Sequence, residues 1–172
     1  MKRAKIHLIT GGQRSGKSEF AERLTLEKSK RPLYLATSKI WDEEYKHRID
    51  EHQSRRGEEW RTIEEEENIA SIELEGETVL LDCITLWLTN IFDTVNYDKK
   101  KALKFAMEQW DEILKKNVEV IVVGNEIGMG VISMDKGTRS FVDAHGSLNQ
   151  YIASMADEVT LMVSGIPVKV KE

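Results

Sequence analysis

Short apolar runs alternate with longer segments of helical periodicity along this chain. The runs at 6–10, 31–38 and 118–124 are rich in aliphatic and β-branched residues, and the last is typical of a parallel strand covered on both faces. The stretch at 78–92 begins as a strand and then turns helical. Further helices are predicted at 17–29, from about 42 to 57, at 99–116 and at 139–156, with two closing strands at 157–165 and 166–171.

This alternation predicts an α/β fold in which a mostly parallel sheet carries helices on both faces. Ligands of such folds bind beyond the carboxyl ends of the strands. The residues that follow predicted strands, at 11–18, 36–38, 82 and 125, are therefore expected to converge on one site. The acidic run at 64–77 is expected to be a surface or mobile stretch.

Length and composition narrow the class of protein. The 172 residues suffice for one core, so we expect a single nucleotide-binding domain over 1–172. Hydrophobic residues make up 40% and charged residues 32%, as in a soluble globular protein. The net charge of −5 argues against general binding to nucleic acid or to acidic membranes.

Cysteine usage and apolar run lengths indicate the compartment. Cys83 is the single cysteine, so no internal disulfide can form, which fits a reducing environment. No apolar run is long enough to cross a membrane, and the start MKRAKIHLIT lacks the apolar stretch of a signal peptide. We expect a cytoplasmic protein without stable membrane insertion.

The turn after the first predicted strand carries a phosphate-binding pattern. It reads GGQRSGKS and meets Gly-x-x-x-x-Gly-Lys-Ser at Gly11, Gly16, Lys17 and Ser18. The glycines let successive amides point at a phosphate, and the following helix adds its positive end. Lys17 would reach the β- and γ-phosphates, and the Ser18 hydroxyl would ligate Mg²⁺.

An acidic residue closes the strand that starts at residue 78. Asp82 follows four residues that can be buried, and a carboxylate in this position is the usual second Mg²⁺ partner in phosphate-loop enzymes. Many strands end in aspartate, so this inference depends on the phosphate loop. Ser18 and Asp82 are the predicted Mg²⁺ ligands.

A basic face is predicted on the helix between 42 and 57. Arg48, His52 and Arg55 are spaced at i, i+4 and i+7, which places them on one face. Such a face could grip a polyphosphate, and the two guanidinium groups would favour the uncharged imidazole, the form that can attack phosphorus. A solvated polar helix would show the same spacing, and the spacing alone favours this simpler interpretation.

Two other features have no chemistry that the pattern reveals. The stretch GNEIGMG at 124–130 follows a strand and suggests a loop that approaches a ligand or a neighbouring subunit. His7 and His145 have no cationic or acidic setting of their own and are expected to be ordinary surface or packing residues.

Taken together, the motifs resemble the bifunctional adenosylcobinamide kinase/adenosylcobinamide-phosphate guanylyltransferase family of cobalamin biosynthesis. The resemblance runs nearly end to end through TGGQRSGKSEFAE, LYLATS, RIDEHQSRR with EWRTIE after it, LLDCITLWLTN, NEIGMG, FVDAHGSLNQYIASMADEV and SGIPVKVK. Many families share a phosphate loop, but this set in this order is specific.

The resemblance implies two reactions on one chain. Such enzymes phosphorylate adenosylcobinamide with ATP or GTP, and then transfer GMP from GTP to the new phosphate through a GMP–histidine intermediate. The nucleophile of the family lies in an Arg-Ile-x-x-His stretch, which implies His52 here and not His47. The resemblance also implies a RecA-like phosphate-loop fold and a homotrimer. Implied GTP contacts are Gly11, Gly12, Gln13, Arg14, Ser15, Gly16, Lys17, Ser18, Ala36, Thr37, Ser38, Gln53, Ser54, Arg55, Arg56, Glu64 and Asp82.

Two other functions compete with this one. A small-molecule kinase without nucleotidyl transfer would need only residues 11–18 and Asp82, and His52 would then be incidental. A nucleotide switch without enzymatic activity would bind GTP and change its affinity for a partner.

Overall fold

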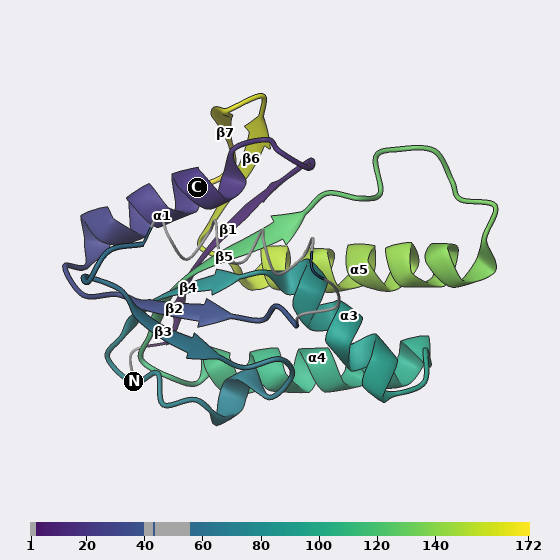
Figure 1. Ribbon diagram of the computed structural model, residues 1–172, viewed down its shortest axis with the longest axis horizontal. Helices are drawn as coiled ribbons and strands as arrows, with labels where there is room; N and C mark the ends of the chain where they lie inside the picture. Colours follow the sequence, from purple (N-terminus) through teal and green to yellow (C-terminus); the bar gives the residue numbers. More distant parts are fainter. Residues whose placement is uncertain (1–2, 40–42, 44–55) are drawn as a thin grey trace.

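A computed structural model describes residues 3–39, 43 and 56–172 of the chain (Figure 1). Most predicted elements are present close to their expected bounds. The strands are β1 (Lys5–Gly11), β2 (Leu33–Ala36), β3 (Arg61–Glu64), β4 (Thr78–Asp82), β5 (Glu119–Asn125), β6 (Glu158–Val163) and β7 (Ile166–Lys171). The helices are α1 (Lys17–Lys28), α3 (Ile84–Thr94), α4 (Lys99–Leu114) and α5 (Lys136–Met155), with a 3₁₀ turn, η1, at Ile69–Ser71.

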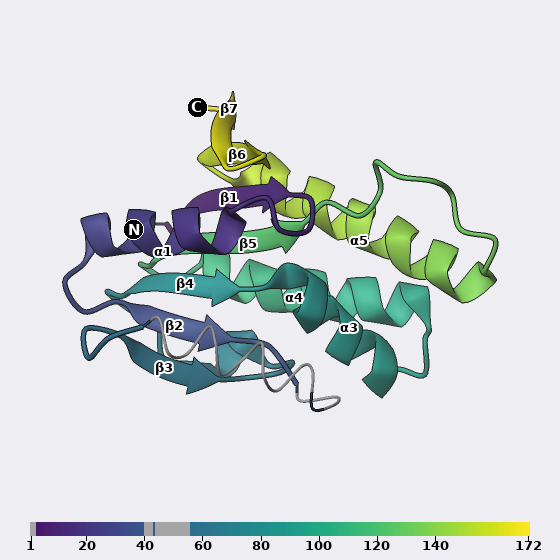
Figure 2. The same cartoon turned by 45° about the horizontal axis from the view of Figure 1, so that its top comes forward.

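One sheet organises the described part of the chain, with its strands in the order β3-β2-β4-β5-β1-β6-β7. All neighbouring pairs are parallel except β6 and β7, which form an antiparallel hairpin at one edge (Figure 2). This arrangement confirms the predicted α/β class. Strand β1 lies between β5 and β6, so the phosphate-binding turn that follows β1 is held between two strands at the carboxyl edge of the sheet.

Helices cover both faces of the sheet, with α1 on one side and α3, α4 and α5 on the other (Figures 1 and 2). Side chains along a strand alternate between the two faces. In β1, Ile6 and Leu8 join the larger core beneath α3, α4 and α5, whereas Ile9 joins a smaller core with Ala21 of α1. None of the described helices is long and apolar enough to cross a membrane.

Three segments differ from the pattern-based expectation. Strand β3 was not predicted, because it is a four-residue edge strand whose side chains are only half-buried or exposed. The acidic run at 64–77 is not simply a surface stretch, since Ile69 and Leu74 are buried in the larger core. Helix α5 begins earlier than expected, because the Asp135 side chain accepts a hydrogen bond from the Thr138 amide and caps it. The helix expected between 42 and 57 lies almost entirely outside the described residues.

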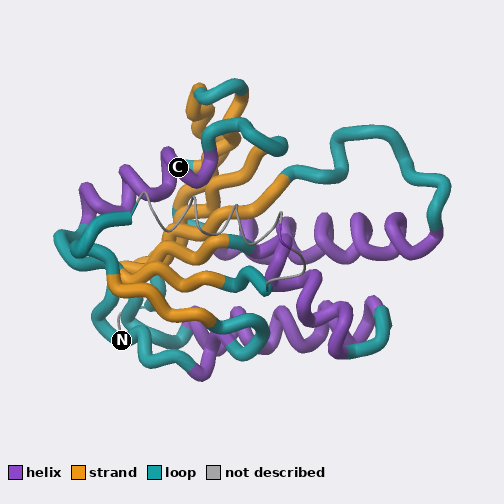
Figure 3. Tube along the Cα trace, in the orientation of Figure 1, coloured by secondary structure: helices purple, strands orange, loops and turns teal. Residues whose placement is uncertain are grey.

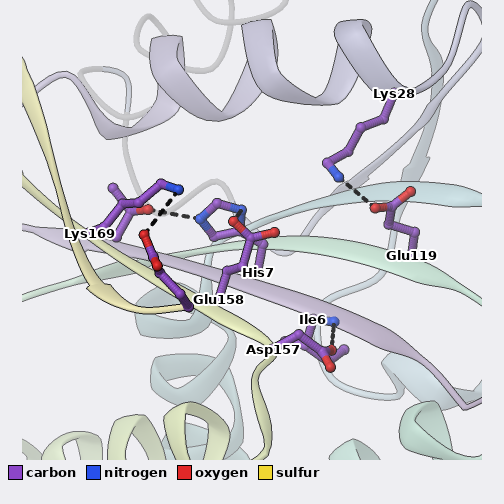
Figure 4. Close-up of polar contacts among 9 residues, drawn as sticks. Ile6, His7, Lys28, Glu119, Asp157, Glu158 and Lys169 are labelled. Carbon is purple, nitrogen blue, oxygen red and sulfur yellow. Dashed lines mark hydrogen bonds and ion pairs between the residues drawn. The ribbon is translucent and has the colours of Figure 1, made fainter.

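Polar side chains tie together the amino ends of the central strands (Figure 4). The Nε2 atom of His7 lies 2.8 Å from Thr160 Oγ1, and its Nδ1 atom lies 3.8 Å from a carboxylate oxygen of Glu158. Beside them, Lys28 at the end of α1 donates to Glu119 at 2.6 Å. Burial lowers the pKa of His7, so this group packs as a neutral imidazole, in agreement with the packing role expected for it.

Candidate nucleotide site

The loop between β1 and α1 adopts backbone conformations suited to an anion. Arg14 has φ 57° and Gly16 has φ 89°, both in the left-handed region. Gly11 is packed so closely that an added Cβ would lie 2.7 Å from the Met162 carbonyl oxygen and from Ser15 Oγ. The loop therefore needs glycine at residue 11 for space, and it delivers the chain into the amino end of α1, whose free amides favour phosphate.

Lys17 lies across this loop. Its ammonium group donates to the Gly12 carbonyl oxygen at 2.7 Å, and the side chain is largely buried. Burial lowers the pKa of Lys17, while the nearby Cys83 and Asp82 raise it. A cation held in a partly desolvated position next to the helix start is well placed to contact a polyphosphate.

Two other segments hold the loop from outside. The Glu126 amide donates to the Gly11 carbonyl oxygen at 2.8 Å, and the Gly165 amide donates to the Ser15 carbonyl oxygen at 2.9 Å. Gly165 belongs to the turn between β6 and β7, and an added Cβ at Gly16 would lie 3.3 Å from its Cα atom. The loop is thus fixed by the ends of both strands that flank β1.

Asp82 ends β4 and belongs to a second polar group. The Tyr34 hydroxyl donates to one Asp82 oxygen at 2.8 Å, and the Arg56 guanidinium carbon lies 3.5 Å from the centre of the Tyr34 ring. Burial and the Asp82 charge raise the pKa of Tyr34 well above its usual value, so the hydroxyl remains a donor. The contacts orient Asp82 and connect it to Arg56.

Thr37 holds the carboxyl end of β2 against the segment after β4. Its hydroxyl donates to the Cys83 carbonyl oxygen and accepts from the Cys83 amide, both at 2.8 Å. Asn90 of α3 donates to the Thr37 carbonyl oxygen at 2.7 Å. The fully buried Thr37 side chain is therefore engaged in the framework, and only its neighbours Ala36 and Ser38 are partly exposed at this edge.

A pocket of about 450 Å³ lies between the phosphate loop and Asp82. Its walls come from the loop, from the end of β4 and from the end of β5: Gln13, Arg14, Lys17, Ser18, Asp82, Cys83, Val123, Asn125, Glu126 and Ile127. Mg²⁺ in phosphate-transfer sites usually takes one or two protein oxygens together with phosphate oxygens and water. A hydroxyl at Ser18 and a carboxylate at Asp82 in one pocket fit that donor set.

A second pocket, of about 570 Å³, lies along β3 and the residues that precede it. Arg56, Gly57, Trp60, Thr62 and Glu64 line it. It is connected to the first pocket through side chains, because Arg56 stacks on Tyr34 and Tyr34 bonds to Asp82. The pair of pockets offers a phosphate-binding part and a neighbouring part with an aromatic ring and a carboxylate.

The structure thus brings together many of the residues predicted from the sequence. The phosphate loop and Asp82 share one pocket, and Arg56 and Glu64 share the other. Residues 36–38 lie at the carboxyl end of β2, where Ala36 is paired with Asp82 of β4. Arg48, His52, Gln53, Ser54 and Arg55 lie outside the described residues. The sequence reasoning did not identify Tyr34 and Trp60, although the motifs LYLATS and EWRTIE contain them.

A buried polar network that was not predicted adjoins the first pocket. The Nε2 atom of His145 lies 2.9 Å from Thr85 Oγ1, which in turn accepts from the Asn125 amide at 3.0 Å. Asn149 lies 3.2 Å from the other ring nitrogen of His145. Burial lowers the pKa of His145 to about 4, although the Glu126 charge raises it. His145 is therefore a packed residue, as expected, and it also supports the pocket wall at Asn125.

A phosphate loop, a carboxylate at the end of a nearby parallel strand and a pocket between them define a nucleotide-binding enzyme of the phosphate-loop α/β class. Residues 7–170 match the model of a protein family described as cobinamide kinase / cobinamide phosphate guanyltransferase. The chain belongs to this family. The membership confirms the resemblance drawn from the motifs and the enzyme class that it implied, a transferase.

Bacterial relatives match over nearly their whole length. The bifunctional adenosylcobalamin biosynthesis protein CobP of Pseudomonas aeruginosa is 41% identical over 169 residues, covering 95% of this chain and 96% of that protein. The protein CobU of Escherichia coli K12 is 39% identical, with 95% and 98% covered. CobU of Salmonella typhimurium LT2 is 38% identical, also with 95% and 98% covered.

Solved structures with a related arrangement are more distant. The flagellar accessory protein FlaH of Methanocaldococcus jannaschii aligns with a TM-score of 0.49 at 14% identity, over 99% of this chain and 80% of that chain. A KaiC-like protein of Pyrococcus horikoshii aligns with the same score and identity, over 91% and 70%.

Proposed function

We propose that this chain phosphorylates adenosylcobinamide with ATP or GTP and then transfers GMP from GTP to the resulting phosphate. The products of the second reaction would be adenosylcobinamide-GDP and pyrophosphate. The observation that carries the proposal is the shared pocket of Lys17, Ser18 and Asp82, in a chain of this family. The relatives from Pseudomonas and Escherichia are named as bifunctional proteins of adenosylcobalamin biosynthesis.

In the first reaction, the aminopropanol hydroxyl of adenosylcobinamide attacks the γ-phosphorus. The bond from that phosphorus to the bridging oxygen breaks, the hydroxyl proton is lost, and the nucleoside diphosphate departs. Loop amides and Lys17 hold the phosphates in line and balance their charge. Ser18 and Asp82 would hold Mg²⁺, which when bound withdraws charge from the phosphate oxygens.

In the second reaction, the attack moves to the α-phosphorus. The imidazole of His52 displaces pyrophosphate and forms a phosphoramidate with GMP, and an oxygen of adenosylcobinamide phosphate then displaces the imidazole. This assignment depends on the family resemblance, because His52 lies outside the described residues. Arg56, which does lie beside the pockets, is a candidate for balancing charge on the transferred group.

The second pocket offers a means of preferring guanine. The exposed Glu64 carboxylate ends β3 in this pocket. Guanine presents two adjacent donors, at N1 and at the 2-amino group, which a carboxylate can accept together, whereas adenine has no donor at N1. We expect Glu64→Ala to lower kcat/KM for GTP by about tenfold, because a bond between charged and neutral groups is lost. Thr62→Ala, in the same pocket, is the control, and equal losses for ATP and GTP would contradict this role.

The covalent intermediate distinguishes this function from a plain kinase. We expect incubation with GTP labelled at the α-phosphate to give a protein label that is stable in base and labile in acid. His52→Asn should abolish this label and GMP transfer, while adenosylcobinamide phosphorylation persists. His47→Asn, on the same stretch, is the matched control and should keep both. A label that survives in the His52 variant would contradict the assignment.

A direct assay addresses the nucleotide switch. A switch would bind GTP without consuming adenosylcobinamide, so formation of adenosylcobinamide phosphate and adenosylcobinamide-GDP would exclude it.

We further propose a single functional domain over 1–172 that works in the cytoplasm as a homotrimer. The net charge of −5 and the single, buried Cys83 are compatible with this placement, and light scattering of the purified protein measures the subunit number.

A further inference from the structure

An uncharged apolar loop joins β5 to α5 at the carboxyl edge of the sheet. Residues 127–134 read IGMGVISM and include no charged side chain, in a chain with 32% charged residues. Four large apolar side chains in this stretch are exposed: Met129 by 78%, Val131 by 100%, Ile132 by 81% and Met134 by 95%. So many exposed apolar side chains in one short loop are typical of a binding surface.

The loop begins inside the nucleotide site. The Glu126 amide donates to the Gly11 carbonyl oxygen, and Ile127 lines the same pocket as Lys17 and Ser18. From there the loop runs outward, away from the sheet, before it returns to α5 (Figures 1 and 3). Its apolar residues therefore continue from the pocket wall toward solvent.

Hydrogen bonds shape the loop at both ends. The Glu126 carboxylate accepts from the Gly128 amide at 2.6 Å and from the Met129 amide at 3.1 Å. At the far end, the Arg139 guanidinium donates to the Ser133 and Met134 carbonyl oxygens at 2.9 and 2.7 Å. These bonds fix the backbone at the two ends of the loop, and the side chains of Met129, Val131, Ile132 and Met134 between them are exposed.

We propose that residues 127–134 bind the corrin ring of the acceptor, with Met129 and Ile132 against its apolar face. This inference rests on the proposed function. The phosphate groups must occupy the pocket at Lys17, so a macrocycle linked to the attacking hydroxyl has to lie outside it, on a surface continuous with the pocket wall. The loop is such a surface, and methionine adapts its shape to irregular apolar partners.

A second exposed apolar surface provides a comparison. Val168 and Val170 on the edge strand β7 are exposed by 45% and 64%. Neither lines either of the two pockets. Contact with another copy of the chain could cover either surface. Of the two, the loop is the one with a residue, Ile127, that lines the pocket of Lys17 and Ser18.

The test compares two double variants of the whole chain. Met129→Ser with Ile132→Ser removes apolar area from the loop, and Val168→Ser with Val170→Ser removes it from β7. Equilibrium dialysis, read by the visible absorption of the corrin, gives the Kd for adenosylcobinamide, and a separate titration gives the Kd for GTP. Steady-state assays give KM and kcat, and light scattering gives the mass.

We expect the loop variant to raise the Kd and KM for adenosylcobinamide by at least about tenfold, because two side chains lose their apolar contacts. Its GTP affinity, kcat and mass should match the wild type, and the β7 variant should bind adenosylcobinamide normally. Met129→Leu with Ile132→Leu should restore binding.

Other outcomes overturn the inference. Unchanged affinity for adenosylcobinamide in the loop variant excludes the loop as the corrin site and leaves the proposed function intact. A lower mass with unchanged acceptor affinity assigns the loop to contacts between copies. If the wild-type protein binds GTP but not adenosylcobinamide, the proposed function itself fails, and the inference fails with it.

Discussion

Gly11 and Gly12 are adjacent in the sequence and face different surroundings. An added Cβ at Gly11 would lie 2.7 Å from a backbone oxygen of Met162, whereas one at Gly12 would have no atom within 4 Å. The obstacle at Gly11 is a strand backbone that cannot move without disturbing the pairing of β1 with β6. The requirement for glycine at residue 11 therefore comes from the fold as well as from the phosphate.

This difference predicts unequal effects of alanine at the two residues. We expect Gly11→Ala to lower the free energy of unfolding by about 1–3 kcal/mol, as overpacking in a filled interior does. Gly12→Ala should change it by less than about 0.5 kcal/mol, as is usual for an exposed residue. Urea unfolding of both variants measures the effect, and equal losses would show that packing at Gly11 is not the cause.

At the scale of elements, the strands at the centre of the sheet and their following turns were predictable. Apolar runs identify β1, β4 and β5, and parallel strands bring their carboxyl ends to one edge, so Lys17 and Asp82 could be expected in one pocket. The short strand β3 was not predictable, because its half-exposed residues give no apolar run.

Contacts between elements that are distant in the chain could not be predicted from the sequence either. Tyr34 meets Asp82 across 48 positions, and Thr85 meets His145 across 60. Each contact depends on the register of a strand or on how a helix lies on the sheet, and neither leaves a local pattern. The spacing of Arg48, His52 and Arg55 predicts one face of a helix, whereas the chemical role of His52 is implied by the family resemblance, and both stay predictions.

Two helices begin with an aspartate cap, and only one of these caps adjoins the loop between β5 and α5. Comparing variants of the two caps therefore tests whether this loop contributes to acceptor binding. The Asp98 side chain accepts from the Lys100 and Lys101 amides at the start of α4, and Asp135 accepts from the Thr138 amide at the start of α5. We expect Asp98→Ala and Asp135→Ala each to lower the free energy of unfolding, because each removes a side chain that caps a helix. Only Asp135→Ala should also raise the KM for adenosylcobinamide, because Asp135 lies at the end of the proposed corrin-binding loop. Equal KM values in the two variants would count against that connection.

For the whole molecule, buried histidines on opposite faces of the sheet make stability depend on pH. Burial lowers the pKa of His145 to about 4 and also lowers that of His7. As the pH falls below the usual value of about 6.5, the unfolded chain takes up these protons before the folded one does. The two histidines therefore make their full contribution to the free energy of unfolding above that pH, and this contribution is lost as the pH falls toward 4.

We expect protonation of His145 alone to lower the free energy of unfolding by about 2 kcal/mol between pH 7 and pH 5. This value follows from the difference between the pKa of His145 in the unfolded and in the folded chain. Urea unfolding at both pH values measures this loss. His145→Gln cannot titrate and should lose correspondingly less over the same interval. A wild-type stability that is the same at both values would contradict the buried, neutral state of these groups.

The order of strands in the sheet also has a consequence for biosynthesis. Strand β1 is made first, yet its partners are β5 and β6, which pair Lys5 with Glu119 and His7 with Glu158. A ribosome that has just released the phosphate loop from its exit tunnel has made neither neighbour, nor the turn at Gly165 that bonds to Ser15. Nascent chains interrupted before Glu119 would expose a β1 with neither neighbour, so they should be poor competitors for the cell's GTP and ready substrates for chaperones.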